Sequence, residues 1–287
     1  MYCGMAGVEH ILAATDLTER SERAFERAAQ LCRDGRATLA LLHVVESALV
    51  AAVRERRHAF AEEYLREWFA KLPEADRAGA RFNVESGEPF AIIIEQARER
   101  SADLIVVGEP GKKGLKELFV GTTTERVVRH SDRPVLVVKQ PTRHAYRRVL
   151  VAIDFSEGAS RALEAALQIA SNAEFLLVHA WQVPPVGFGS LEAAEKAMAK
   201  ENELLRKRLE RQAQDHLMEL ASPAPPPRIE MVVGNPFFVI REAISSFEPD
   251  LLAMGTHTRS GIAIAMVGSL AREFLVEAPC DVLVARA

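Results

Sequence analysis

The stretch HILAATDLTERSERAFERAAQL, residues 10–31, recurs in altered form as RVLVAIDFSEGASRALEAALQI at residues 148–169. Each copy opens with an apolar run that ends in an aspartate, and these two aspartates, Asp16 and Asp154, are 138 residues apart. Apolar residues then follow at i, i+1, i+4, i+5 and i+8, which lie on one face of a helix. The chain therefore carries one strand–helix unit twice. A repeat of this length indicates two duplicated domains.

The remaining segments of each copy follow in the same order. We expect further strands at residues 39–46, 82–87, 102–107 and 133–139, and again at 175–182, 230–233, 249–254 and 280–286. Strands that alternate with helices predict parallel sheets. The sequence thus predicts an α/β fold of two tandem, doubly wound domains with five-stranded parallel sheets, at residues 1–140 and 147–287. A longer helical insertion is expected in the second domain, at about 186–227.

Composition narrows the class of protein. The 287 residues are 48% hydrophobic and 26% charged, which is typical of soluble globular proteins, and the net charge of −4 argues against nucleic acid as a partner. Three cysteines, Cys3, Cys32 and Cys280, have no metal-ligand spacing and fit a reducing compartment. We see no signal peptide and no apolar run long enough to span a membrane, so we expect a cytoplasmic protein.

A glycine-rich segment, GEPGKKGLKELFVGTTTERV at 108–127, directly follows the apolar run ADLIVV. In open parallel sheets ligands bind beyond the carboxyl ends of strands, where the strand order reverses. If the first and fourth strands are neighbours at that point, Asp16 and this segment face one crevice. A plain turn between a strand and a helix remains the alternative.

The end of that segment predicts the start of a helix. Thr122 and Glu125 have the spacing of a capping box, which alone could explain the threonine. The amides at a helix start also form an anion site. Gly111 and Gly121 lack a Cβ atom, so a phosphate could approach the backbone there, and Lys112 would add positive charge.

The pattern Gly108-x2-Gly111-x9-Gly121-Thr122 resembles the ATP-binding signature of the universal stress protein family. The aspartate that ends the first strand, the LLHV strand and a Gly-x-Pro ending also resemble that family, and the match covers nearly the whole chain, twice. The resemblance implies a Rossmann-like fold of the adenine nucleotide α-hydrolase type and a stress-response regulator that binds ATP or AMP, with Mg as an option. It implies these site residues: Asp16, Gly108, Gly111, Lys112, Gly121, Thr122 and Thr123. Glu109 and Pro110 depart from the family pattern.

The second copy keeps only part of this pattern. Its matching residues are Asp154, Gly255, Gly268 and Ser269, while Thr258 replaces the middle glycine. A Cβ atom there could crowd a phosphate or forbid a required backbone angle. Arg272 stands where Glu125 stood, so the capping box is lost. We expect the second site to be weaker or empty.

Catalysis is not indicated. We find no P-loop motif, no paired aspartates and no metal ligands, so we expect no catalytic or metal-binding residues, with slow ATP hydrolysis left open. His43 and His179 lie among apolar strand residues and are interpreted as core histidines whose hydrogen bonds are satisfied. The partners expected are an adenine nucleotide and unidentified proteins.

A second hypothesis is a carrier of an apolar ligand such as an acyl chain, or an interaction scaffold. Phe60, Tyr64 and Trp68 recur every four residues, and a helix expected at about 190–220 carries a leucine-rich stripe. Such stripes ordinarily belong to the hydrophobic core.

The final strand of each half should lie at a sheet edge. The two edges could pair within one chain to give a pseudo-dimer, and a further homodimer stays open.

Overall fold

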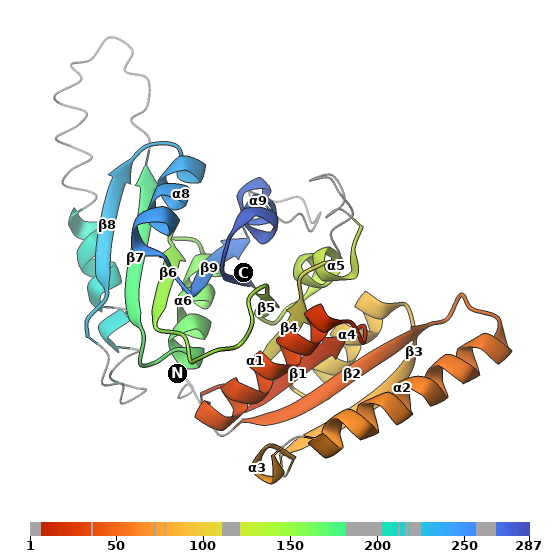
Figure 1. Cartoon of the computed structure of the whole chain (residues 1–287). Coiled ribbons are helices and arrows are strands. Elements are labelled where there is room, and N and C mark those ends of the chain that lie inside the picture. The colour runs from red at the N-terminus through yellow and green to blue at the C-terminus, as the bar shows by residue number, and fades with distance from the viewer. Residues whose placement is uncertain are drawn as a thin grey trace.

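The two halves of the chain share one continuous sheet (Figure 1). The computed structural model describes residues 7–35, 37–71, 73–77, 79–110, 121–181, 203–211, 213–215, 218, 225–256 and 268–287. Ten strands are arranged in the order β3-β2-β1-β4-β5-β10-β9-β6-β7-β8. Each half therefore contributes five parallel strands in equivalent order, which confirms the predicted doubly wound α/β fold.

The elements alternate as predicted. The first half consists of β1 (His10–Thr15), α1 (Glu19–Gly35), β2 (Thr38–Glu46), α2 (Ala51–Lys71), α3 (Glu74–Arg77), β3 (Ala80–Gly87), α4 (Pro89–Glu99), β4 (Leu104–Gly108), α5 (Thr123–His130) and β5 (Val135–Val138). The second half consists of β6 (Arg148–Ala152), α6 (Glu157–Ile169), β7 (Glu174–Trp181), β8 (Arg228–Val233), α8 (Pro236–Phe247), β9 (Leu251–Thr256), α9 (Ser269–Glu277) and β10 (Asp281–Arg286). Most of the predicted insertion lies outside the described residues, within which 203–211 are helical.

Local sequence explains where these elements begin. Pro89 and Pro236 are the first residues of α4 and α8, where a helix needs no amide hydrogen and proline already has a helical φ. The predicted helical stripes are also confirmed, since Phe25 and Leu163 are almost completely buried on α1 and α6. All four residues of β5 are buried, as expected for a strand covered on both faces.

The first and fourth strands are neighbours, which is the condition under which Asp16 and the glycine-rich segment share one crevice. β1 pairs in parallel with β4, with Ile11 opposite Leu104, and β2 lies on the other side of β1. The strand order therefore reverses between β1 and β4, because β2 and β3 lie on one side of β1 while β4 and β5 lie on the other. Folds of this kind bind ligands in the crevice beyond the carboxyl ends of the strands at such a point.

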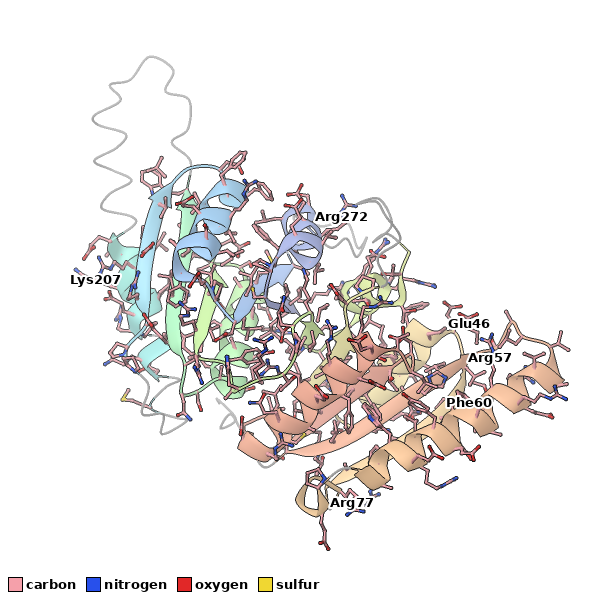
Figure 2. The ribbon with its side chains drawn as sticks, viewed as in Figure 1. Glu46, Arg57, Phe60, Arg77, Lys207 and Arg272 are labelled. Atoms are coloured by element: carbon pink, nitrogen blue, oxygen red, sulfur yellow. The ribbon has the colours of Figure 1, made fainter. Side chains whose placement is uncertain are left out.

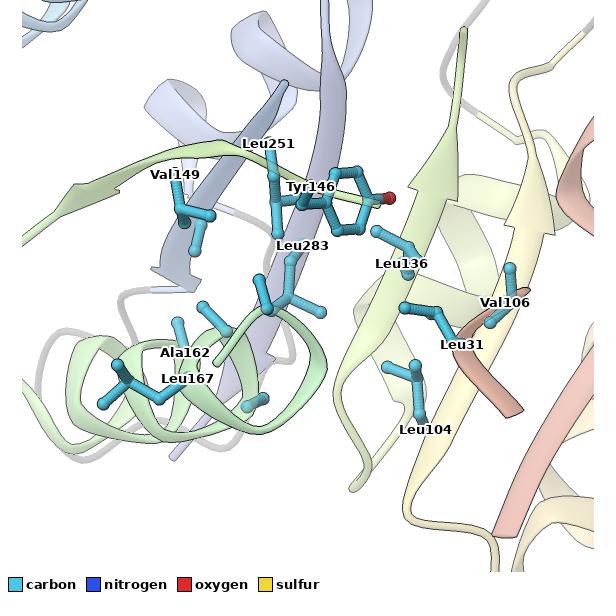
Figure 3. Packing of buried hydrophobic residues seen from close by; sticks show 14 of the residues in the cluster. Leu31, Leu104, Val106, Leu136, Tyr146, Val149, Ala162, Leu167, Leu251 and Leu283 are labelled. Atoms are coloured by element: carbon cyan, nitrogen blue, oxygen red, sulfur yellow. The ribbon is translucent and has the colours of Figure 1, made fainter. Parts of the chain in front are cut away.

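The halves are joined by their last strands. β5 and β10 pair antiparallel, with Val137 opposite Val282 and Leu136 opposite Leu283, which confirms the pairing of edges within one chain. One hydrophobic cluster on each face of the sheet includes residues from both halves, among them Leu136 and Leu283 on the side of α1 and α6 (Figure 3). The hydrophobic core therefore continues across the joint on both faces of the sheet.

A buried carboxylate lies at this joint. Asp281 is fully buried and accepts hydrogen bonds from the backbone amides of Lys139 (2.8 Å) and Gln140 (3.0 Å) and from the hydroxyl of Tyr146 (2.7 Å). The guanidinium of Arg27, on α1, lies 3.4 Å from the same carboxylate and stacks 4.1 Å from the centre of the Tyr146 ring. Burial raises the pKa of Asp281, and these donors oppose that effect. Four partners from the first half and the linker thus satisfy one side chain of the second half.

Replacing Asp281 with alanine should destabilise the whole protein. The change leaves the Arg27 charge without its buried counter-ion and the Lys139 and Gln140 amides without their acceptor, and removal of one partner from a buried ion pair costs about 3–5 kcal/mol. Asp281→Asn keeps an oxygen for the amides and should cost less. Urea unfolding measures the free energy.

The matched control is Asp132→Ala, because Asp132 forms an exposed ion pair with Arg98. That pair should contribute less than about 1 kcal/mol. Equal losses for Asp281→Ala and Asp132→Ala would contradict a stabilising role for the buried carboxylate.

Candidate functional site

A cleft of about 460 Å³ opens beyond the carboxyl ends of β1, β2 and β4. Strand ends, the start of α1, a residue of α2 and the start of α5 all contribute to its wall. Its polar and charged lining residues are Thr15, Asp16, Arg20, Ser21, His43, Glu46, Arg57, Glu109, Thr122, Thr123 and Thr124. Figure 2 shows Glu46 and Arg57 near one another, where β2 ends and α2 begins. The structure therefore brings four predicted site residues together: Asp16, Gly108, Thr122 and Thr123.

A strained turn holds Asp16 at the cleft. Leu17 has φ +62°, a left-handed conformation that is costly for a residue with a Cβ atom, and the equivalent Phe155 has φ +61°. Both side chains pack against the core on that face, which offsets the strain. The turn directs the Thr18 amide and hydroxyl onto Asp16 Oδ1. Desolvation by burial favours the neutral acid, but hydrogen bonds from Thr18 and Ser21 and the charge of Arg20 outweigh it and lower the pKa of Asp16. Asp16 is therefore an anion at neutral pH.

Close packing of α1 on β4 requires a glycine at position 108. A Cβ atom there would lie 2.9 Å from the carbonyl oxygen of Arg20, so the first turn of α1 could not pack on the end of β4. Gly255 is equivalent, since its Cβ would lie 2.5 Å from the amide nitrogen of Ala159 in α6. Close packing of a helix on a strand explains both glycines without a ligand.

The start of α5 has the geometry that the sequence predicted. Gly121 has φ +85°, which favours glycine, and nothing lies within 4 Å of the position of a Cβ atom. Thr122 caps the helix by accepting a hydrogen bond from the Glu125 amide, while the Glu125 carboxylate accepts one from the Gly121 amide. The Thr124 hydroxyl donates to the Gly108 carbonyl, which ties α5 to β4. Gly111 and Lys112 lie outside the described residues.

His43 belongs to the cleft, which the sequence did not predict. Its Nδ1 donates to the Thr15 carbonyl (2.9 Å), so its hydrogen bond is satisfied as expected. The side chain is only half-buried and lines the cleft, however, so its placement in the core was wrong. Burial lowers the pKa of His43, against the opposing effects of the Thr15 carbonyl and the Asp16 charge. His179 is likewise half-buried and donates to the Ile153 carbonyl (2.7 Å).

Two arginines in the cleft were also missed. Arg20 is four residues after Asp16, in the first turn of α1. Because this turn directly follows the end of β1, the position of Arg20 at the cleft could have been predicted. Its Nε is buried and has no hydrogen-bond partner among the described residues. Arg57 reaches the cleft from α2, and no local pattern distinguished it from the other arginines of that helix.

The equivalent position in the second half is built differently. Gly268 has φ −53° and α9 begins at Ser269, so the helix starts one residue earlier than α5 does. Within the part of the chain that the structure describes, no side chain caps α9. Asp154 keeps the turn of Asp16 and accepts hydrogen bonds from the amide and hydroxyl of Ser156. The aspartate is thus preserved in the second half and the capped helix start is not.

The arrangement in the first half suits a polar ligand with an anionic group. Two arginines and the first turn of a helix favour negative charge, while Asp16 is an oriented acceptor for hydroxyl or amino groups.

Among the described residues, no group of three or more His, Cys, Asp or Glu side chains could hold a metal ion. The helices in the described ranges include none long and apolar enough to cross a membrane.

Comparisons with known proteins agree with the geometry. The model of the universal stress protein family matches residues 7–139 and 145–286. The universal stress protein YxiE of Bacillus subtilis is 32% identical over 144 residues, which cover 45% of this chain and 97% of that protein. A universal stress protein from Archaeoglobus fulgidus has the same fold, with a TM-score of 0.70 at 22% identity over 96% of this chain and 98% of its own. A universal stress protein solved in complex with cAMP is 26% identical, covers 50% of this chain and 98% of its own, and has a TM-score of 0.36.

The lowered pKa of His43 should make stability depend on pH. The unfolded chain takes up a proton on this side chain near its ordinary pKa of 6.5, while the folded protein takes it up only at lower pH. The free energy of unfolding should therefore fall as the pH drops below 6.5, and this loss should be smaller in His43→Gln. Urea unfolding at about pH 7.5 and about pH 5.5 tests this. His10→Gln, at an exposed histidine, is the control and should behave like the wild type. Equal losses in His43→Gln and the wild type would contradict the assignment.

Proposed function

The chain belongs to the universal stress protein family, with two copies of the family domain in tandem, and from this premise we propose that it is a stress-response regulator that binds an adenine nucleotide. The nucleotide, ATP or AMP, occupies the cleft of the first half. Its binding biases the conformation of the protein or its choice of partner.

The cleft at the β1/β4 switch point is the observation that carries this proposal. An anionic, oriented Asp16 and the first turn of α5 both line it. Its volume of about 460 Å³ lies within the range usual for small-molecule sites. A plain turn between a strand and a helix would not need these two features to line one cleft.

Each part of a nucleotide has a matching group. The phosphates lie at the start of α5, by Gly121, Thr122 and Thr123, where the helix dipole favours negative charge. Asp16 accepts a hydrogen bond from the ribose hydroxyls or the adenine amino group. Arg20 lines the same cleft and adds positive charge there. Gly111 and Lys112 are predicted to complete the phosphate site, and Mg would neutralise phosphate charge there if it is bound.

Acidic side chains limit how far this site favours phosphate. Glu46 and Glu109 line the cleft, and the Glu125 carboxylate accepts the hydrogen bond of the Gly121 amide. Arg20 and Arg57 offset part of this negative charge. We therefore propose binding without dedicated catalysis, and slow ATP hydrolysis is compatible with this proposal.

We propose that the second half has a weaker site or an empty one, around Asp154, Gly255, Gly268 and Ser269. Gly255 is explained by its packing against α6, and α9 starts without the capped turn of α5. Asp154 retains the hydrogen-bonded turn of Asp16.

We also propose cytoplasmic residence, because the three cysteines are odd in number and far apart in the sequence, which fits a reducing compartment. Protein partners stay unidentified in this proposal, and a homodimer would use the outer strands β3 and β8 or the helices beside them.

The alternative of an apolar-ligand carrier is less favoured. Trp68 lies 4.3 Å from the Phe25 ring and Tyr64 donates a hydrogen bond to Glu22, so most of the aromatic stripe on α2 packs against α1. Phe60 is 61% exposed. Of the second stripe, Leu209 is buried in the core, and Leu191, Ala194, Met198, Leu217 and Leu220 lie outside the described residues. Mass spectrometry of the denatured protein separates the two functions by detecting a nucleotide or a fatty acid.

Asp16→Ala and Asp154→Ala are a matched pair, because both aspartates end equivalent strands with the same turn. Loss of a charged hydrogen bond to the ligand weakens binding by about 10- to 100-fold, and we expect this for Asp16→Ala. Asp154→Ala should leave the affinity of the first half unchanged. Calorimetry with ATP on ligand-stripped protein measures both. An unchanged affinity in Asp16→Ala, or no binding by the wild type, would refute the proposal.

A further inference from the structure

Two basic side chains cross the joint between the halves. Lys139, which follows β5, donates from Nζ to the carbonyls of Leu275 (3.3 Å) and Val276 (3.1 Å) in α9. Arg286, the last residue of β10, donates from Nη1 to the carbonyl of Arg129 in α5 (3.3 Å). Lys139 and Arg286 are 147 residues apart, and so are Arg129 and Val276. The duplication has therefore produced one contact twice, once in each direction.

Both contacts are made to the last turn of a helix. The carbonyls at the end of a helix have no partner within it and form the negative end of the helix dipole, so a cation there is favourable. The opposite ends of these helices are the predicted ligand loops, at Thr122 for α5 and at Gly268 for α9. Figure 1 shows α5 and α9 on the same face of the sheet, on either side of the joint, and both contribute to the cluster that covers it. Each half thus donates a hydrogen bond to the last turn of the helix whose first turn forms the predicted ligand loop of the other half.

The helix α5 is only eight residues long, and within the first half Arg126 pairs with Glu88 and lies over the Phe90 ring of α4. Val127 and Val128 bury its apolar side, and the Thr124 hydroxyl ties its start to the Gly108 carbonyl. Arg286 provides a contact at its other end, from the opposite half. A short helix released at one end can tilt as a unit, and the amides of its first turn would then move away from a bound anion.

We infer that Arg286 is a positioning residue for the ligand cleft of the first half. It holds α5 by the Arg129 carbonyl and so keeps the first turn of that helix aligned with the cleft. This inference rests on the proposed nucleotide site. It also means that a change in the second half that shifts β10 changes the affinity of the first half for phosphate. Lys139 holds the last turn of α9 in the same way, through the Leu275 and Val276 carbonyls.

Arg286 is the better residue to test. Lys139 is only 7% exposed and its amide binds Asp281, so its replacement would disturb the joint itself. Arg286 is half-buried at the end of its strand, and a leucine there keeps much of its volume. Arg161, which donates from Nη1 to the Arg286 carbonyl and pairs with Glu157, is a matched control at the same place on the surface.

The experiment compares Arg286→Leu, Arg286→Lys and Arg161→Leu with the wild type, with ATP and adenosine as separate probes in calorimetry. Arg286→Leu should weaken ATP binding by about three- to ten-fold and leave adenosine binding unchanged, because only the phosphates meet the first turn of α5. Arg286→Lys should restore most of the affinity for ATP. Arg161→Leu should match the wild type. Equal changes for ATP and adenosine, or none for either, would overturn the inference.

Hydrogen exchange of the ligand-free protein tests the inference independently of any ligand. Amides of α5, including that of Ser131, which donates to the Val127 carbonyl, should exchange faster in Arg286→Leu than in the wild type. Exchange in α1 should not change. If α5 exchanges at the same rate in both proteins, the inference is wrong even if ATP binds. If the wild type binds no ATP while α5 is loosened, the proposed function fails and the anchoring of α5 stands.

Discussion

The antiparallel pairing of β5 with β10 is the contact on which the rest of this structure depends. Each half ends in a buried apolar strand that would otherwise leave an open sheet edge. Pairing the two edges makes one sheet and carries a hydrophobic core across both of its faces. Asp281 reinforces the joint, because backbone amides, Tyr146 and Arg27 from the other side all converge on it. The same joint brings Arg286 to α5 and Lys139 to α9, so each of these helices contacts the opposite half.

Most of the fold could be predicted from the sequence because its signals are local and occur twice. The strand ending in Asp16 and the helix stripe around Phe25 recur in the second copy, and the order of the elements predicts parallel pairing. The Asp281 network could not be predicted. Asp281 follows Cys280 like any polar residue at the start of a strand, and its partners Lys139 and Arg27 are more than one hundred residues away. Only folding shows that the carboxylate is buried. The crossing contacts of Lys139 and Arg286 were hidden for the same reason.

The site was predicted in part. Asp16, Thr122 and Glu125 lie where their patterns indicated, because a strand end and a helix cap are local features. Arg57 and His43 reach the cleft from α2 and β2, and no spacing in the sequence relates them to Asp16. Gly108 shows that one residue can satisfy two requirements. It fits a ligand signature, and it is also the only residue type that lets α1 pack on β4. A glycine pattern alone therefore overstates the evidence for a ligand, whereas an oriented Asp16 and a capped α5 that line one cleft strengthen it.

We expect the joint to open only when the whole protein unfolds. Native-state hydrogen exchange at increasing urea concentrations measures this most directly, at the amides of Lys139 and Gln140, which donate to the Asp281 carboxylate. Their free energies of exchange should merge with that of global unfolding, together with the amides of β1 and β6. If Lys139 and Gln140 exchanged at a much lower free energy while β1 and β6 stayed protected, the joint would open on its own. The halves would then be independent domains in loose contact, which contradicts a single cooperative unit.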